Sequence, residues 1–205
     1  MRQFLAACLA MICGIGFVNA EEPADGLQLQ APAEWKGETI SLPPSFSPNM
    51  TLNGTEVIRF APGMFNQNSD SFFSYVFVFQ VKPGQKLTQK LIQKELLVYY
   101  RGLAATVLKN QKIQFDPKNF ALKLQETKAA VAVQPPNSKA YKGDLNWLEP
   151  FVTRKPQTLY LELTTWQDAE SKYDYVFVCA SPKKTTEAIW KDMRAIRESF
   201  YTSRQ

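Results

Sequence analysis

The residues of this sequence that could do chemistry are carboxylates and basic side chains, because its 205 residues include no histidine. Serine triads, histidine acid–base catalysis and most zinc sites need an imidazole, so these classes are excluded. A hydrolase could instead use two carboxyl groups as general acid and base. The candidates are Asp144, Glu149, Glu162, Asp168, Glu170 and Asp174. Their spacing does not show that any two converge, so no catalytic residue is predicted.

Motifs for cofactors and metal ions are also missing. The sequence contains no P-loop, no GxGxxG after a strand, no CxxC pair and no calcium-loop pattern. We therefore expect neither a cofactor nor a metal ion. Binding through charge or through apolar surface is the chemistry that remains.

A surface of positive charge is one candidate binding site. Basic side chains recur along one side of the helix predicted to begin near Thr88, where Glu95 is the only acid. A solvated helix face has this pattern, and so does a surface that binds an anionic partner. One more arginine is the lone charge of an apolar strand that ends at Pro62-Gly63. The predicted binding residues are Arg59, Lys86, Lys90, Lys94 and Arg101.

A pocket lined by aromatic rings is another candidate. A sheet that curves around a helix can leave space for a small apolar or amphipathic ligand. The rings that could line it are Tyr75, Phe77, Phe79, Tyr160 and Trp166. The same rings would also fit an ordinary hydrophobic core.

The segment from Phe72 to Asn110 must position most of these residues. Its first part, FFSYVFVFQVK, is apolar on both faces at the two-residue period of a strand, which predicts a central strand covered on both sides. After a turn at Pro83-Gly84, apolar residues recur at helical spacing. They are Ile92, Leu96, Tyr99, Leu103 and Val107. The segment therefore predicts a central strand followed by a long amphipathic helix.

Shorter strands and a closing helix complete the predicted domain. Strand patterns cover residues 35–42, 55–61, 119–126, 157–166 and 173–180, of which the last two form a hairpin, while 138–153 looks irregular or bulged. The closing helix buries Ile189, Met193, Ile196 and Phe200. Its basic residues, among them Arg194 and Arg197, are interleaved with acids and are expected in solvent. Strands joined by short turns pair antiparallel, so the predicted fold class is α+β: an antiparallel sheet flanked by a long central helix and a C-terminal helix.

The N-terminus predicts export. Arg2, an apolar run from Phe4 to Val18 and small residues before Glu21 are typical of a signal peptide. We expect a signal peptide over 1–20, a flexible arm over 21–33 and a single α+β domain over 34–205. The apolar run is shorter than the roughly 20 residues that span a membrane, so no transmembrane segment is expected once the signal peptide is removed. The protein is therefore expected in a periplasm or outside the cell.

The cysteines and the net charge indicate whether a disulfide can form and which kind of partner the protein could bind. The other two cysteines lie in the predicted signal peptide, so Cys179 cannot form an intrachain disulfide and is expected as a small buried hydrophobe. The formal net charge of +5 suits an anionic surface or protein partner. It lacks the density of a nucleic-acid-binding protein, so no nucleic acid is expected as a partner.

The order of elements resembles the PsbP-like family, whose members have a central antiparallel sheet flanked by helices. The resemblance is carried by the short strand that ends at proline in ETISLPP, by the central helix and by the closing IRESF over residues 196–200. It spans Trp35 to Phe200 and implies the fold, with no metal-binding or photosystem role transferred. We therefore expect an exported, non-enzymatic binding or accessory protein. The alternatives are a carrier of a small apolar or amphipathic ligand and a carboxylate-based hydrolase.

Overall fold

The computed structural model describes residues 27–111, 113, 115–128 and 134–203 of the chain, so the predicted signal peptide lies outside the described residues. The strands are β1 (Lys36–Leu42), β2 (Gly54–Phe60), β3 (Tyr75–Val81), β4 (Ala121–Thr127), β5 (Lys139–Leu148), β6 (Pro156–Gln167) and β7 (Asp174–Ser181). The helices are α2 (Gln89–Asn110), α3 (Ala188–Thr202) and the short 3-10 helix η1 (Pro117–Asn119).

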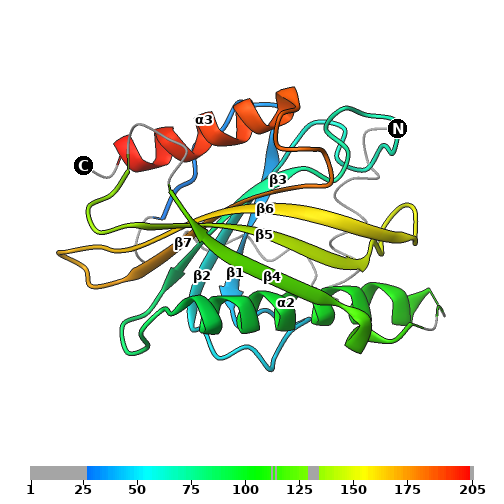
Figure 1. The fold of residues 1–205 in the computed structure, drawn as a ribbon, viewed down its shortest axis with the longest axis horizontal. Coiled ribbons are helices and arrows are strands. Elements are labelled where there is room, and N and C mark those ends of the chain that lie inside the picture. The colour runs from blue at the N-terminus through cyan, green and yellow to red at the C-terminus, as the bar shows by residue number, and fades with distance from the viewer. Residues whose placement is uncertain (1–26, 112, 114, 129–133, 204–205) are drawn as a thin grey trace.

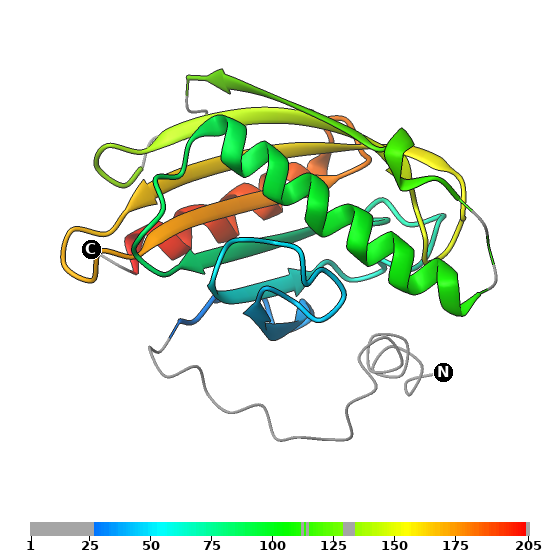
Figure 2. The same ribbon diagram turned by 90° about the horizontal axis from the view of Figure 1, so that it is seen from below.

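In the described part of the chain the strands form one sheet in the order β1-β2-β3-β7-β6-β5-β4, and all neighbours are antiparallel. Figure 1 shows α2 and α3 on opposite faces of this strongly twisted sheet. Seen from the α2 side, this helix crosses the strands diagonally (Figure 2). The predicted α+β class, with an antiparallel sheet between a long central helix and a C-terminal helix, is confirmed.

β3 has the central position that the sequence predicts. All of its residues are buried, and it lies between β2 and β7. Tyr75, Phe77 and Phe79 belong to the core under α2, whereas Val76 and Val78 belong to the core under α3. Burying one large apolar side chain contributes about 1.5 to 3 kcal/mol, so a strand that is apolar on both faces is most stable where both are covered.

α2 begins near Thr88, as the sequence predicts. Thr88 is the N-cap, and its hydroxyl accepts a hydrogen bond from the backbone N–H of Leu91 at 3.2 Å. The predicted apolar face packs on the sheet, with Ile92 and Leu96 each 1% exposed. Leu103, farther along this face, is half-buried at the edge of a cavity that is described below.

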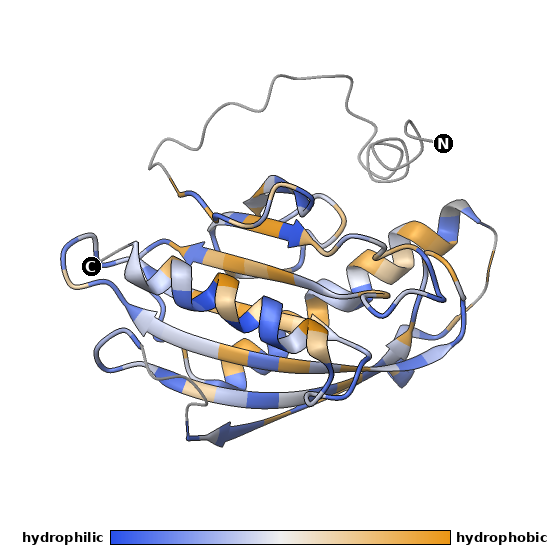
Figure 3. Cartoon of the chain, turned by 90° about the horizontal axis from the view of Figure 1, so that it is seen from above, coloured by the Kyte–Doolittle hydropathy of each residue, from blue (hydrophilic) through white to orange (hydrophobic). Residues whose placement is uncertain are grey.

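α3 covers the opposite face as predicted. Its buried apolar residues are Ile189, Trp190, Met193, Ile196, Phe200 and Tyr201. The indole N–H of Trp190 donates a hydrogen bond to the carbonyl oxygen of Lys183 at 2.9 Å, which fixes the start of the helix. Viewed from the α3 side, hydrophilic and hydrophobic residues alternate along this helix (Figure 3), in keeping with one buried and one solvated face.

The stretch over 138–153 is more regular than predicted. β5 is a ten-residue strand that pairs with both β4 and β6. The chain leaves the sheet only after it, in a turn where the Glu149 carboxylate accepts hydrogen bonds from the backbone N–H groups of Phe151, Val152 and Thr153. Glu149 is fully buried. This candidate acid therefore holds a turn together.

The residues before β1 are packed against the sheet. Leu27 and Leu29 are 2% and 1% exposed, and both join the core under α3 together with Trp35. The predicted flexible arm over 21–33 is therefore packed on the sheet at Leu27 and Leu29, because two leucines spaced two residues apart present one apolar face to the sheet. Residues 21–26 lie outside the described part of the chain.

Gly102 allows the loop after β1 to approach α2 closely. A Cβ at this position would lie 2.4 Å from the backbone oxygen of Phe46 and 2.8 Å from the Cβ of Ser47. The loop cannot simply move away, because the Ser47 hydroxyl donates a hydrogen bond to the carbonyl oxygen of Val98 at 3.0 Å. This close approach places Phe46 beside the helix.

We expect Gly102→Ala to lower the free energy of unfolding by about 1 to 3 kcal/mol, although alanine usually favours a helix. The added methyl group must displace the loop, and urea denaturation measures the loss. The control Thr106→Ala, one turn later, should change stability by less than about 0.5 kcal/mol. Equal stability of Gly102→Ala and wild type would contradict the close packing.

Candidate ligand-binding cavity

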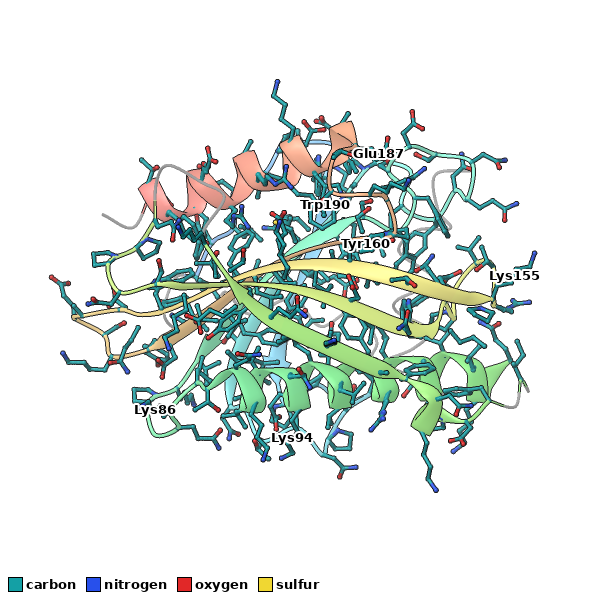
Figure 4. All side chains as sticks on the ribbon, viewed as in Figure 1. Lys86, Lys94, Lys155, Tyr160, Glu187 and Trp190 are labelled. Carbon is teal, nitrogen blue, oxygen red and sulfur yellow. The ribbon has the colours of Figure 1, made fainter. Side chains whose placement is uncertain are left out.

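Three of the predicted basic residues form an exposed positive surface. Lys86, Lys90 and Lys94 are exposed, and Figure 4 places Lys86 and Lys94 at the α2 layer, on the side away from α3. The Nζ atom of Lys94 lies 3.4 Å from Oε1 of Glu95, which offsets part of its charge. This surface is solvated, and exposed charges of this kind are screened by salt.

The two arginines among the predicted binding residues form hydrogen bonds with backbone carbonyl oxygens of the fold. Arg59 alternates with the inward residues of β2 and shares the α3 face of the sheet with Val57. Its guanidinium donates a hydrogen bond to the carbonyl oxygen of Ile58 at 2.9 Å, and burial lowers its pKa. Arg101 donates a hydrogen bond to the carbonyl oxygen of Phe120 at 2.9 Å, just before β4. The predicted site that combines Arg59 with the basic residues of α2 is therefore wrong, because they lie on opposite faces of the sheet.

The five aromatic residues predicted to line one pocket also lie on two faces. Tyr75, Phe77 and Phe79 are in the core under α2. Trp166 is in the core under α3 and Tyr160 packs against this core, as Figure 4 shows for Tyr160. The sheet separates the two groups, so this pocket does not form. Of the five, only Tyr75 lines the cavity described below.

The six candidate acids have separate structural surroundings. Glu149 caps its turn, and Glu162 is paired with arginines. Asp168 accepts hydrogen bonds from the backbone N–H and the hydroxyl of Ser171, in the turn between β6 and β7. The others are Asp144 and Glu170, which are exposed, and Asp174, which begins β7. Among the described residues, no three acidic or cysteine side chains are placed to hold a metal ion.

Glu162 is paired under α3 with two arginines that were expected in solvent. Arg194 donates from Nε and Nη2 to the two carboxylate oxygens at 3.0 and 2.7 Å. Nη1 of Arg197 lies 3.5 Å from Oε2, and the Arg197 side chain is only 3% exposed, so its predicted exposure is wrong. Burial alone would raise the pKa of Glu162, but the hydrogen bond with Arg194 and the charges of both arginines lower it. The cluster fastens α3 to the sheet.

A cavity lies between the β1–β2 edge of the sheet and α2. Its volume is about 50 Å³. A water molecule needs roughly 10 to 15 Å³ of such space, so the cavity can hold a group of about four non-hydrogen atoms. Its aliphatic walls include Ile40 and Ile58 from the strands, Leu103 from α2 and Met64 from the loop after β2.

Aromatic rings make up most of the remaining wall. Phe46, from the loop after β1, meets Tyr99 of α2 edge-to-face, with ring centroids 5.0 Å apart. Phe73 lies 5.8 Å from Tyr75 and 5.8 Å from Phe151. The other two rings are Phe60 and Phe65. Because these residues come from distant parts of the sequence, only the folded chain assembles them.

Glu38 of β1 is the charged side chain that lines the cavity. It is half-buried, and burial raises its pKa. Among the described residues, no lysine or arginine forms an ion pair with it. An unpaired carboxylate at an apolar cavity favours a ligand that supplies positive charge or a hydrogen-bond donor.

Glu56 of β2 is a second carboxyl group beside the cavity, and it is fully buried. Its Cα pairs with that of Ile40, which lines the cavity. The Tyr99 hydroxyl donates a hydrogen bond to Oε1 at 3.0 Å, whereas Oε2 has no hydrogen-bond partner among the described residues. Burial and the charge of Glu38 raise the pKa of Glu56 to about 8, although the hydrogen bond from Tyr99 opposes the shift. Glu56 is therefore mostly protonated at about pH 7.

Two more hydroxyl groups lie close to Glu56. The hydroxyls of Tyr75 and Tyr100 are 2.8 Å apart, and burial raises the pKa of both. Among the described residues that line the cavity, none is a lysine or an arginine. The polar groups at this site are therefore the neutral hydroxyls of the tyrosines and the carboxyl groups of Glu38 and Glu56.

The sequence carried a signal for Glu56 that the prediction did not use. Ile58 and Phe60 are alternate apolar residues of β2, and by the period of a strand Glu56 lies on the same face as both. An acid at an inward position of a strand is uncommon, because burying its charge is costly. Glu38 carried no comparable signal, since β1 is short and largely exposed.

Comparison with known proteins gives no family for this chain. The sequence matches no protein-family model and no curated protein. The resemblance to the PsbP-like family therefore stays a prediction. Among the described residues, no helix combines the length and the apolar character needed to cross a membrane.

Proposed function

We propose that this is an exported, non-enzymatic binding protein that holds a small, largely apolar group of its ligand in the cavity beside Glu38. The cavity is the observation that carries this proposal. Binding sites are typically concave, mostly apolar and equipped with a few polar groups that orient the ligand. The cavity has this composition, with aromatic and aliphatic walls and the carboxyl group of Glu38. Glu56 lies next to the lining residue Ile40 in the sheet.

The size of the cavity limits the ligand. Sites for drug-sized ligands have volumes of roughly 300 to 1,000 Å³. A cavity of about 50 Å³ accommodates the end of a molecule or a small molecule, and the rest of a larger ligand would remain outside. This favours recognition of one chemical group over enclosure of a whole lipid.

Binding is favoured over hydrolysis by the surroundings of the acids. Glu149 and Glu162 are occupied by backbone N–H groups and arginines, so neither is free to transfer a proton. Export is supported by the signal-peptide pattern of residues 1–20. Protein for the test below is therefore best prepared by export of the full-length chain.

The test is an NMR titration with tert-butanol, a compact apolar probe. We expect backbone amide signals of β1, β2 and α2 around the cavity to shift in wild type. Leu103→Trp places an indole at the cavity wall and should weaken tert-butanol binding by about tenfold or more, because the indole competes for the same space.

Leu97→Trp is the matched control for this titration. Leu97 is a half-buried leucine of α2 that does not line the cavity, so this variant should bind tert-butanol like wild type. Two results would contradict the proposal. One is the absence of shifts around the cavity in wild type, and the other is unchanged binding by Leu103→Trp.

A further inference from the structure

We infer that the group held in the cavity is a small alkylammonium ion, such as a trimethylammonium group, which the aromatic rings surround and the Glu38 carboxylate neutralises. The inference rests on the proposed function and defines the chemistry of its ligand. Three features of the cavity support it: the rings, the unpaired acid, and a second acid with a free oxygen atom.

The rings provide the environment that alkylammonium ions prefer. The face of an aromatic ring carries partial negative charge and attracts a cation within about 6 Å of its centroid, while the methyl groups of the cation gain apolar contact. Rings line the cavity from several directions: Phe46 and Tyr99 form an edge-to-face pair, and the ring centroids of Phe60 and Tyr75, a tilted pair, are 6.4 Å apart. A neutral apolar ligand would gain only the apolar contact.

The charge of the lining is complementary to a cation. Glu38 is the one charged side chain among the described lining residues, and its carboxylate forms no ion pair in the described part of the chain. Burial without a partner destabilises its charged form. A bound cation would provide the missing partner, whereas an anion would be repelled.

Glu56 provides a second carboxyl group, which lies beside the cavity on the same face of the sheet as Glu38. Oε1 accepts the hydrogen bond from Tyr99, but Oε2 is buried and lacks a partner among the described residues. Unpartnered buried polar atoms are rare and call for an explanation. A cation in the cavity would stabilise the ionised form of Glu56 and so give this oxygen a role.

The groups that face Glu56 determine how binding depends on pH. They are Glu38 on β1, Tyr99 and Tyr100 on α2, and Tyr75 on β3. The tyrosines stay neutral, because burial raises the pKa of each. Glu56 has a pKa of about 8 in the free protein, and a nearby cation lowers it. Cation binding therefore releases a proton and strengthens as the pH rises toward about 8.

The experiment compares choline with neohexyl alcohol, in which a neutral tert-butyl group replaces the trimethylammonium group. Calorimetric titrations at about pH 6 and about pH 9 lie on either side of the Glu56 pKa. We expect choline to bind more tightly than neohexyl alcohol at both values and about tenfold more tightly at the higher pH than at the lower. Binding of neohexyl alcohol should not strengthen as the pH rises.

Variants of the acids identify the source of the preference. Glu38→Gln should weaken choline binding by about tenfold and leave neohexyl alcohol binding unchanged. The control Glu170→Gln removes an exposed acid from the turn between β6 and β7, outside the cavity lining, and should bind both compounds like wild type.

The outcomes separate this inference from the proposed function. If choline and neohexyl alcohol bind equally, or only neohexyl alcohol binds, the inference is overturned and the proposed function stands. If Glu38→Gln binds choline as tightly as wild type does, the assigned role of Glu38 is overturned. If neither compound nor tert-butanol binds, both proposals fail together.

Discussion

Replacing Glu162 with glutamine is expected to lower the free energy of unfolding by about 3 to 5 kcal/mol, because the change leaves a buried arginine without its counter-charge. Arg197 is 3% exposed and has no other acid within ion-pair distance in the described part of the chain. Arg194 loses the charge of its partner as well, but it is 28% exposed and can be hydrated by solvent. Urea denaturation at neutral pH measures the loss.

The destabilisation caused by Glu162→Gln is expected to decrease at low pH. In the folded protein the two arginines hold the pKa of Glu162 below its usual value, so the stabilising contribution is present above the unfolded-state pKa and is lost as the pH falls through the folded-state pKa. The difference between wild type and Glu162→Gln should therefore shrink below about pH 4.

Two further variants test the cause of the destabilisation. Asp192→Asn removes an exposed acid from the same helix and should change stability by less than about 0.5 kcal/mol. The double variant Glu162→Met with Arg197→Met should recover much of the loss, because no buried charge is left unpaired. If Glu162→Gln were as stable as wild type, the cluster would not be what holds α3 to the sheet.

The features that could be predicted from the sequence depend on neighbouring residues. The period of two in FFSYVFVFQVK indicated the central strand, and apolar residues every three or four positions after Thr88 indicated the helix. The hairpin of β6 and β7 and the amphipathic closing helix follow the same local rules. Local patterns of this kind determine which elements form and therefore the fold class.

The candidate site could not be predicted because it depends on which sheet face each helix covers. Tyr75 and Tyr160 are both aromatic strand residues, but one lies under α2 and the other packs under α3. Their faces depend on the pairing of β3 with β7 and of β7 with β6. Arg59 was misplaced for the same reason, since one step along β2 separates the two faces.

Long-range packing also explains the errors at β5 and α3. Residues 138–153 looked irregular or bulged, but Gly143 lies inside β5, where a Cβ would come within 2.5 Å of the Leu124 side chain on β4. Arg197 was expected in solvent, but its partner Glu162 lies on β6, which is separated from α3 along the sequence by all of β7. In both places the deciding neighbour is on another element, which a local pattern does not reveal.

Replacing Glu56 with glutamine is expected to stabilise the protein by roughly 4 kcal/mol near pH 8, because the wild-type chain must keep this buried carboxyl group protonated. The unfolded chain loses the proton near 4.5, whereas the folded chain holds it until about 8. Wild-type stability should therefore decline as the pH rises from 4.5 to about 8 and then level off. The glutamine side chain cannot ionise, and its amide oxygen can still accept the hydrogen bond from the Tyr99 hydroxyl.

Urea denaturation of wild type and Glu56→Gln over this pH range tests the expectation. The stability gap should be close to zero near pH 4 and largest near pH 8, whereas Glu170→Gln, at an exposed position, should show no such gap. A gap that does not change with pH would mean that Glu56 ionises normally. If the gap follows the expectation while Glu56→Gln loses the pH dependence of choline binding, then the acid that destabilises the fold is the one that the ligand uses. Such a trade of stability for function is expected of a binding site.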